Sequence, residues 1–101
     1  MKPAIGRIVI VRNFHSNGSG DQPAVINRTW GDGDTAEGPI CVNVCVLPDC
    51  GTPTCLTSVP LYDSREAADR YLISMVGHAP RIAHWPDREP QARAVAVRKA
   101  A

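Results

Sequence analysis

The chain has little net charge and no long apolar run, and each shortage excludes a class of protein. Lysine and arginine total 11 against 10 aspartate and glutamate residues, and the net charge of +1 gives no electrostatic footprint for nucleic acid or an acidic membrane. No apolar run approaches the roughly 20 residues needed to span a bilayer, and Met1–Ile5 is too short and too mixed for a signal peptide. We therefore expect a cytosolic protein that does not bind membranes.

The sequence also lacks the residue patterns that mark enzymes. The three histidines, His15, His78 and His84, form no H-x-x-x-H or H-E-x-x-H pair. No G-x-S-x-G motif surrounds a nucleophile, and Gly18–Asp21 lacks the Lys-Ser/Thr that completes a phosphate-binding loop. Because the parts of an active site are missing, we predict no catalytic residues and no enzymatic activity.

Four cysteines, at positions 41, 45, 50 and 55, suggest zinc or a disulfide, but their spacing argues against a metal. Within a strand, Cys41 and Cys45 lie on one face about 13 Å apart, which is too far to share a tetrahedral ion. A cross-strand disulfide between Cys45 and Cys55 is geometrically feasible, whereas the cytosol keeps thiols reduced. We expect four free thiols, with Cys50 the most exposed, and neither metal nor cofactor.

The strongest structural signal present is a β-hairpin at Ile40–Pro60. Two apolar runs rich in β-branched residues flank the sequence PDCGTP, whose prolines, aspartate and glycine favour a turn. Two earlier strands are predicted at Ile5–Arg12 and Pro23–Trp30, joined by a polar loop at Asn13–Gln22 that is rich in glycine, serine and asparagine. A short closing strand is predicted at Arg81–Trp85.

One convincing helix lies between the hairpin and the closing strand. Asp63 is a candidate N-cap, and Glu66 follows three positions later as in a capping box. Apolar residues then recur at four-residue spacing as far as Val76, which gives the helix one apolar face. Gly77 and Pro80 end it. We therefore predict an amphipathic helix over residues 63–76.

These elements predict a mainly β fold: a small SH3-like or OB-like, partly open barrel of five strands with one amphipathic helix. An α+β sandwich is the alternative, and pairing of the first strand with the last one distinguishes the barrel.

Residues 1–88 form the single domain, and residues 89–101 are an Ala/Arg-rich tail or a partner-dependent helix. The helix has more apolar surface than a barrel end covers, so we expect a homo-oligomer through residues 63–76. The expected core residues are Ile8, Val9, Ile10, Ile26, Val44 and Val46.

Several short motifs resemble an uncharacterised group of small proteins encoded by tailed bacteriophages. They are KPAIGRIVIV, PAVINRTW, VNVCVLPDCGTPTCLTSVP and HWPDR, in this order over most of residues 2–88. The likeness depends chiefly on R-x-W, V-N-V and H-W-P, and the predicted helix and the Ala/Arg tail depart from the compact pattern of the group. The resemblance implies an accessory protein that acts in the infected bacterial cytoplasm, and it implies no catalytic residues.

Candidate ligand contacts are the arginine, histidine and tryptophan residues near the ends of predicted strands. Alternation along the second strand places Arg28 and Trp30 on the face that also carries Ile26. A tryptophan ring can stack on a base and a guanidinium can bind phosphate, although both tryptophans are also typical core residues. The predicted site for a small, anionic, base-containing ligand comprises Arg28, Trp30, Arg81, His84 and Trp85.

Three functions agree with these features. The first is a phage counter-defence protein that sequesters a nucleotide-like immune signal or blocks a host effector. The second is a nucleic-acid-binding accessory module, which the near-zero net charge disfavours although Arg88–Arg98 offers a basic strip. The third is a minor protein of virion assembly. A native mass measurement distinguishes the three by a retained small nucleotide, a retained nucleic acid or neither.

Overall fold

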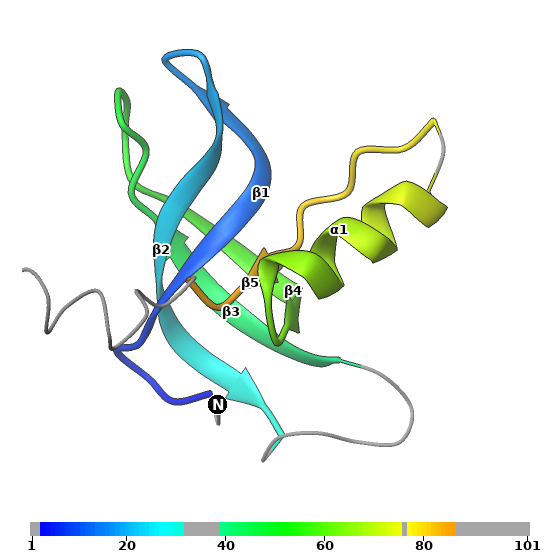
Figure 1. Ribbon diagram of the computed structural model, residues 1–101. Helices are drawn as coiled ribbons and strands as arrows, with labels where there is room; N and C mark the ends of the chain where they lie inside the picture. Colours follow the sequence, from blue (N-terminus) through cyan, green and yellow to red (C-terminus); the bar gives the residue numbers. More distant parts are fainter. Residues whose placement is uncertain (1–2, 32–38, 76, 87–101) are drawn as a thin grey trace, which may run out of the picture.

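In the part of the chain that the structure describes, five strands form a closed barrel and one helix lies beside it (Figure 1). The structure is a computed structural model that describes residues 3–31, 39–75 and 77–86. The mainly β barrel fold predicted from the sequence is confirmed. The barrel was predicted to be partly open, and in the structure it is closed. The predicted last helical residue, Val76, and the predicted tail 89–101 lie outside the described residues. In chain order the elements are β1 (Ile8–Ser16), β2 (Ser19–Trp30), β3 (Ile40–Val46), β4 (Thr54–Tyr62), α1 (Arg65–Ser74) and β5 (Ala83–His84).

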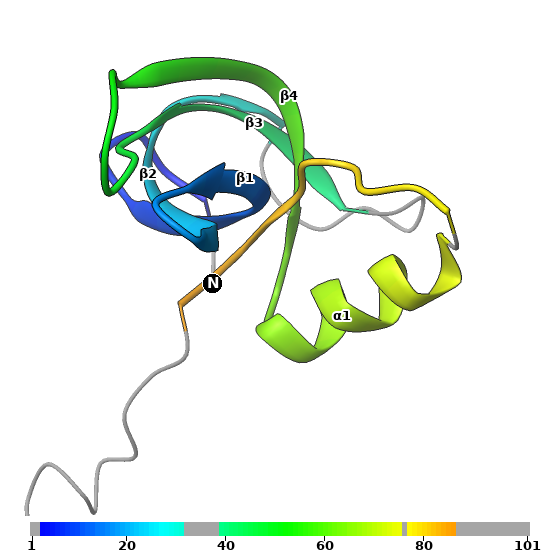
Figure 2. The same ribbon diagram turned by 90° about the horizontal axis from the view of Figure 1, so that it is seen from above.

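The barrel closes through the short strand β5. This strand pairs antiparallel with β1, where His84 lies opposite Ile10, and parallel with β4, where Ala83 lies opposite Leu61. Figure 2, the view from above, shows the strands curling into a ring with α1 outside it. The pairing of the first strand with the last is the one that distinguishes a barrel, and it excludes the α+β sandwich.

The segment Asn13–Gln22 is not the loop that its composition predicted. β1 continues to Ser16 and β2 begins at Ser19, so the two strands form a long hairpin. The turn residues Asn17 and Gly18 both have positive φ, 51° and 86°, which asparagine and glycine tolerate well. The prediction was wrong because small polar residues typical of loops also occupy the exposed end of this hairpin.

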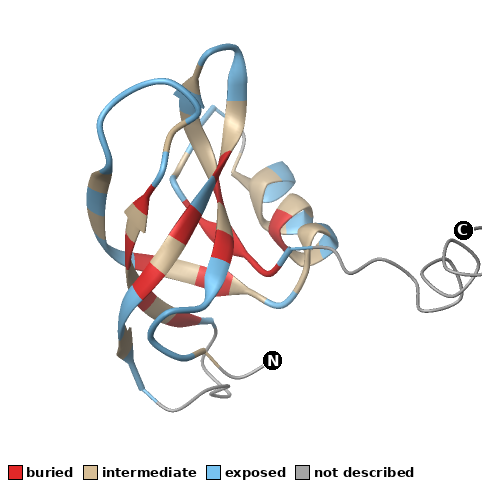
Figure 3. Cartoon of the chain, turned by 90° about the vertical axis from the view of Figure 1, so that its left-hand side faces the viewer, coloured by how far each residue is buried: buried red, intermediate tan, exposed pale blue. Residues whose placement is uncertain are grey.

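Buried residues alternate with more exposed ones along the strands, as the colours in Figure 3 show. The aliphatic side chains of the buried residues form the core of the barrel. Val42, Val44 and Val46 on β3 are fully buried, whereas the residues between them are partly exposed. Two predicted core residues point outward from β1, which is apolar on both faces: Ile8 is 46% exposed and Ile10 is half-buried. The core comprises Val9, Val11, Ala24, Ile26, Ile40, Val42, Val44, Val46, Val59, Leu61, Ala83 and Trp85.

Helix α1 begins after Ser64 rather than at Asp63, and it packs on the outside of the barrel against β4 and β5. The Ser64 hydroxyl accepts a hydrogen bond from the backbone N–H of Ala67 at 3.1 Å. Serine and aspartate are similarly good N-caps, so the sequence Asp-Ser did not distinguish them. The ring of Tyr71 stacks on that of Tyr62, with centroids 5.2 Å apart. Part of the apolar face predicted for oligomer contacts is therefore used within the chain.

Ion pairs connect α1 to the β1–β2 hairpin. The guanidinium of Arg12 contacts Asp21 on β2 at 3.0 Å and Asp69 on α1 at 2.7 Å. Arg65 at the start of α1 contacts the second carboxylate oxygen of Asp21 at 3.2 Å. Because the side chain of Arg12 is only 17% exposed, water screens its contacts less than those of a surface pair. The network holds the helix against the barrel.

We expect this network to make stability depend on pH below about 4, where carboxyl groups ordinarily titrate. The hydrogen bond from Arg12 holds the pKa of Asp69 below its ordinary value. A carboxyl group with a lowered folded-state pKa contributes stability that is complete above its unfolded pKa and is lost as the pH falls through the lowered value. Urea unfolding across this range should therefore show a weaker acid dependence in Asp69→Asn than in the wild type. Glu66→Gln is the matched control, and an unchanged acid dependence in Asp69→Asn would contradict this role.

Candidate functional site

A β-bulge in β2 decides the direction in which Arg28 and Trp30 point. The register of β2 against β3 shifts between Ile26 and Arg28, which leaves Asn27 as an extra residue in the ladder. Ile26 is buried in the core, whereas Arg28 lies opposite Asn43 and both Arg28 and Trp30 are exposed. The prediction that these two residues share a face with Ile26 is wrong. They do share the outer face with each other.

Arg28 and Trp30 form a stacked cation–π pair on this outer face. The Cζ atom of Arg28 lies 3.9 Å from the centroid of the Trp30 ring. The ring nitrogen Nε1 of Trp30 donates a hydrogen bond to Oδ1 of Asn43 at 2.8 Å, which fixes the orientation of the indole. Trp30 nevertheless remains 47% exposed, a large fraction for such a ring. Arg28, Trp30 and Asn43 together are named the outer site.

Asn43 also satisfies a backbone group beside an irregularity between β3 and β4. The register of this ladder shifts between Val42 and Val44, and Ser58 on β4 has a positive φ of 53°. The backbone N–H of Ser58 donates to Oδ1 of Asn43 at 2.9 Å. The same side-chain oxygen therefore links the indole of Trp30 to β4. Sequence analysis missed Asn43, although a polar residue in the middle of an apolar strand was its signal.

Replacing Asn43 by alanine is expected to destabilise the protein by about 1–3 kcal/mol, since it removes two hydrogen bonds of about 0.5–1.5 kcal/mol each. The N–H groups of Ser58 and Trp30 would lose their shared acceptor and turn to water. Asn43→Asp is the matched control, because aspartate keeps an acceptor oxygen at the same place. Urea denaturation measures both variants. Equal stability of Asn43→Ala and the wild type would contradict this linking role.

Arg81 lies at the opposite end of the β1–β2 hairpin from the outer site. Its Cζ atom is 4.6 Å from the centroid of the Phe14 ring, near the turn, whereas Trp30 is the last residue of β2. The amide of Asn13 donates to the backbone oxygen of Pro80 at 2.7 Å and ties the segment before β5 to the same end of the hairpin. Arg81 therefore does not join Arg28 in one small site.

His84 and Trp85 are both buried. Trp85 is 5% exposed and part of the core, and His84 is fully buried. Nδ1 of His84 lies 2.8 Å from the backbone oxygen of Trp85, and because a carbonyl oxygen only accepts, Nδ1 is the donor of this hydrogen bond. Among the described residues, Nε2 of His84 has no hydrogen-bond partner. Of the five predicted ligand contacts, the structure brings together Arg28 and Trp30 and places the other three elsewhere.

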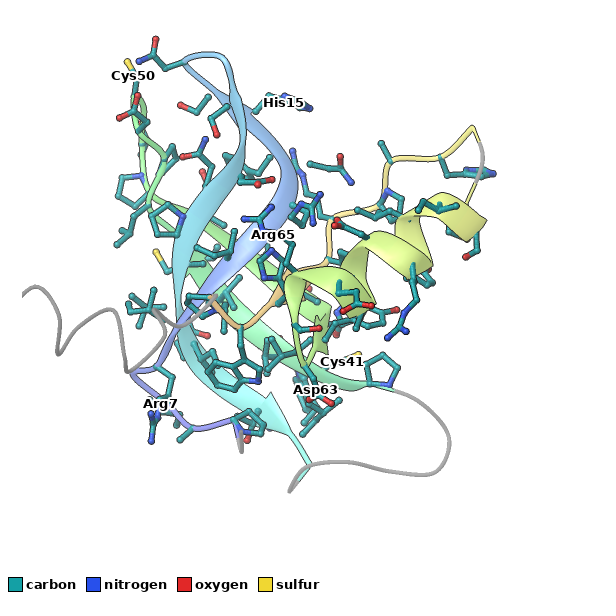
Figure 4. All side chains as sticks on the ribbon, viewed as in Figure 1. Arg7, His15, Cys41, Cys50, Asp63 and Arg65 are labelled. Carbon is teal, nitrogen blue, oxygen red and sulfur yellow. The ribbon has the colours of Figure 1, made fainter. Side chains whose placement is uncertain are left out.

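The four cysteines are free thiols spread along the β3–β4 hairpin. Figure 4 shows Cys50 at the tip of the hairpin and Cys41 towards its other end. Over residues 3–31, 39–75 and 77–86, no group of three or more His, Cys, Asp or Glu side chains is placed to hold a metal ion. Within those same ranges, no helix has the length and apolar character of a membrane span.

The fold and the outer site define a small closed β-barrel whose interior is packed with side chains and whose exposed aromatic and cationic groups lie on the outside. Comparisons of the chain with protein-family models, with curated proteins and with solved structures found no match. The residues of the outer site are thus the basis on which a function can be assigned.

Proposed function

We propose that the protein is a phage-encoded accessory protein of the infected bacterial cytoplasm, which acts by binding rather than by catalysis. Its ligand would be a small, anionic, base-containing molecule of the nucleotide type, captured as part of counter-defence. The observation that carries this proposal is the exposed Arg28–Trp30 stack, with 3.9 Å between the guanidinium carbon and the ring centroid. Two motifs of the phage resemblance, R-T-W and V-N-V, contain the three residues of the outer site.

The chemistry of the pair suits such a ligand. The planar guanidinium that covers the indole extends the stack outward, so a base can stack on it, and the edge of the guanidinium retains N–H groups that can donate to phosphate. Stacking contributes about 1–3 kcal/mol per base and a charge-assisted hydrogen bond about 1.5–3 kcal/mol. Millimolar to micromolar binding requires about 4–8 kcal/mol. The outer site alone therefore supports weak capture, and a further contact from a second copy of the chain would tighten it.

Calorimetric titration tests the proposal. Cyclic nucleotides and ADP-ribose are the probes, and ribose 5-phosphate, which has a phosphate but no base, is the control ligand. We expect heat of binding from at least one base-containing probe and at least about 10-fold weaker binding of ribose 5-phosphate, since a stacking contribution of about 1.4 kcal/mol is tenfold in affinity. No heat from any probe, or equal binding of ribose 5-phosphate, would contradict the proposed ligand class.

A homo-oligomer through residues 63–76 is part of the same proposal. The side chain of Ile73 on α1 is 74% exposed, and it offers the apolar surface through which a second copy would contact this helix. We expect light scattering at micromolar concentration to show a dimer for the wild type and a monomer for Ile73→Asp. Glu66→Ala, on the same helix, is the control that should leave the mass unchanged. A monomeric wild type would contradict the oligomer.

Blocking of a host effector protein is the second candidate function. Tryptophan and arginine are the residue types that dominate protein–protein binding energies, and both are exposed in the outer site. Ile8 on β1 and Leu47 after β3 add exposed apolar surface, at 46% and 43%. A net charge of +1 gives no comparable support for nucleic acid as a partner.

A further inference from the structure

Cys45 and Cys55 lie directly opposite each other on neighbouring strands. They are register partners in the antiparallel ladder of β3 and β4. Both point outward, since Val44 and Val46 on either side of Cys45 are buried in the core. Directly opposed residues in such a ladder have Cα atoms about 4.5–5.5 Å apart and Cβ atoms about 4.5–5.5 Å apart. A disulfide needs Cα atoms about 4.4–6.8 Å apart and Cβ atoms about 3.5–4.5 Å apart, so a small approach of the two side chains is sufficient.

The two thiols already interact in the reduced protein. Partial burial raises the pKa of Cys45, and the neighbouring Cys55, through its charge and a side-chain hydrogen bond, raises that pKa further. Cys55 is exposed and open to a reagent in solution, whereas Cys45 is half-buried beside it. Cys55 can therefore react first with a reagent in solution. Cys45 then lies close enough to attack the sulfur of Cys55 and to displace the group attached to it.

We propose that Cys45 and Cys55 form a paired dithiol that low-molecular-weight disulfides of the glutathione type oxidise to a cross-strand disulfide. The thiolate of Cys55 attacks one sulfur of glutathione disulfide, which breaks the S–S bond and releases one glutathione thiolate. Cys45 then loses its proton to solvent and attacks the Cys55 sulfur, which expels the second glutathione. Two protein thiols become one disulfide, and one glutathione disulfide becomes two thiols.

The other two cysteines lack this arrangement. Cys41 lies opposite Pro60 in the same ladder. Cys50 is exposed in the turn between the strands, where its backbone N–H donates to the hydroxyl of Ser16 at 3.1 Å. Neither has a cysteine as its register partner, so a glutathione adduct on either one has no neighbouring thiol to displace it. The reaction is therefore expected to be specific to the Cys45–Cys55 pair.

The experiment uses the full chain with Cys41→Ser and Cys50→Ser, which retains the pair alone. After treatment with excess glutathione disulfide under native conditions, we expect intact mass to show the loss of two hydrogens and thiol titration to show the loss of both thiols. Adding Cys45→Ser to this background should instead trap one glutathione on Cys55. Circular dichroism checks that each variant is folded. If the Cys45→Ser protein does not fold, the Cys55→Ser variant is used in its place.

A second readout is thermal unfolding of the oxidised pair. The cross-link constrains the unfolded chain, so the oxidised form should have a higher Tm, and dithiothreitol should reverse the shift because an exposed disulfide is readily reduced. Two retained thiols, a stable glutathione adduct on the pair, or a disulfide that joins two chains would each overturn the proposal.

Discussion

Replacing Val44 by aspartate is expected to unfold the barrel. Val44 is fully buried, opposite Ile26 on β2 and Leu56 on β4. Both register partners are apolar, and Arg28, at the next position of the β2–β3 ladder, lies on the outer face. A buried aspartate here is therefore uncompensated, which costs about 3–5 kcal/mol or more. Small domains have only about 5–15 kcal/mol of stability to lose. Circular dichroism and urea denaturation should show a largely unfolded Val44→Asp protein at 25 °C.

Ile8→Asp is the matched control for this change. It introduces the same charge in place of a β-branched residue of β1, but the side chain of Ile8 points outward and is 46% exposed. The aspartate at this place stays in water, and the fold should be retained. A soluble, cooperatively folded Val44→Asp protein, or unfolding of both variants alike, would contradict the assignment of inward and outward faces.

Replacing Arg28 by alanine is expected to weaken ligand binding by about 10- to 150-fold while leaving the fold intact. The change removes a charge-assisted contact of about 1.5–3 kcal/mol, which corresponds to that range of affinity. Because Arg28 is exposed on the outer face of β2, its loss removes no core packing. Calorimetry with the probe that binds the wild type measures the effect.

Two variants separate this contact from a general effect of charge. The first is Arg70→Ala, which removes an arginine on α1 whose side chain is 72% exposed. This variant should bind the ligand as tightly as the wild type does. Arg28→Lys keeps the charge but lacks the planar fork that binds phosphate in two places, so its affinity should fall between the other two. Equal losses for Arg28→Ala and Arg70→Ala would show that net charge, rather than the outer site, sets the affinity.

The sequence was sufficient to predict the barrel because its strands are rich in β-branched residues and because the hairpin Ile40–Pro60 has strong turn chemistry. The closing strand before Pro86 is predicted from the sequence, whereas its pairing with β1, which distinguishes a barrel from an α+β sandwich, is seen in the structure. The error at Asn13–Gln22 arose from weighing the polar composition of the segment above the dipeptide Asn17-Gly18, which is the strongest short signal for a two-residue hairpin turn.

The site was harder to predict because it depends on register. The bulge at Asn27 reverses the direction of Arg28 and Trp30, and nothing in the alternation of β2 indicates where an extra residue enters the ladder. Trp85 and Trp30 both come at strand ends, yet one fills the core and the other is exposed. Which tryptophan faces outward depends on the neighbouring strands, and a pattern within one strand does not contain that information.

The fluorescence of Trp30 tests most directly whether the outer site binds a base. The protein has two tryptophans, and Trp85 is 5% exposed in the core, so a stacked ligand reaches Trp30 first. Titration with ADP-ribose and cyclic nucleotides should quench the emission of the wild type, and Trp30→Phe should show no quenching at the same concentrations. Quenching that persists unchanged in Trp30→Phe, or its absence from the wild type with every probe, would contradict ligand capture at Arg28 and Trp30.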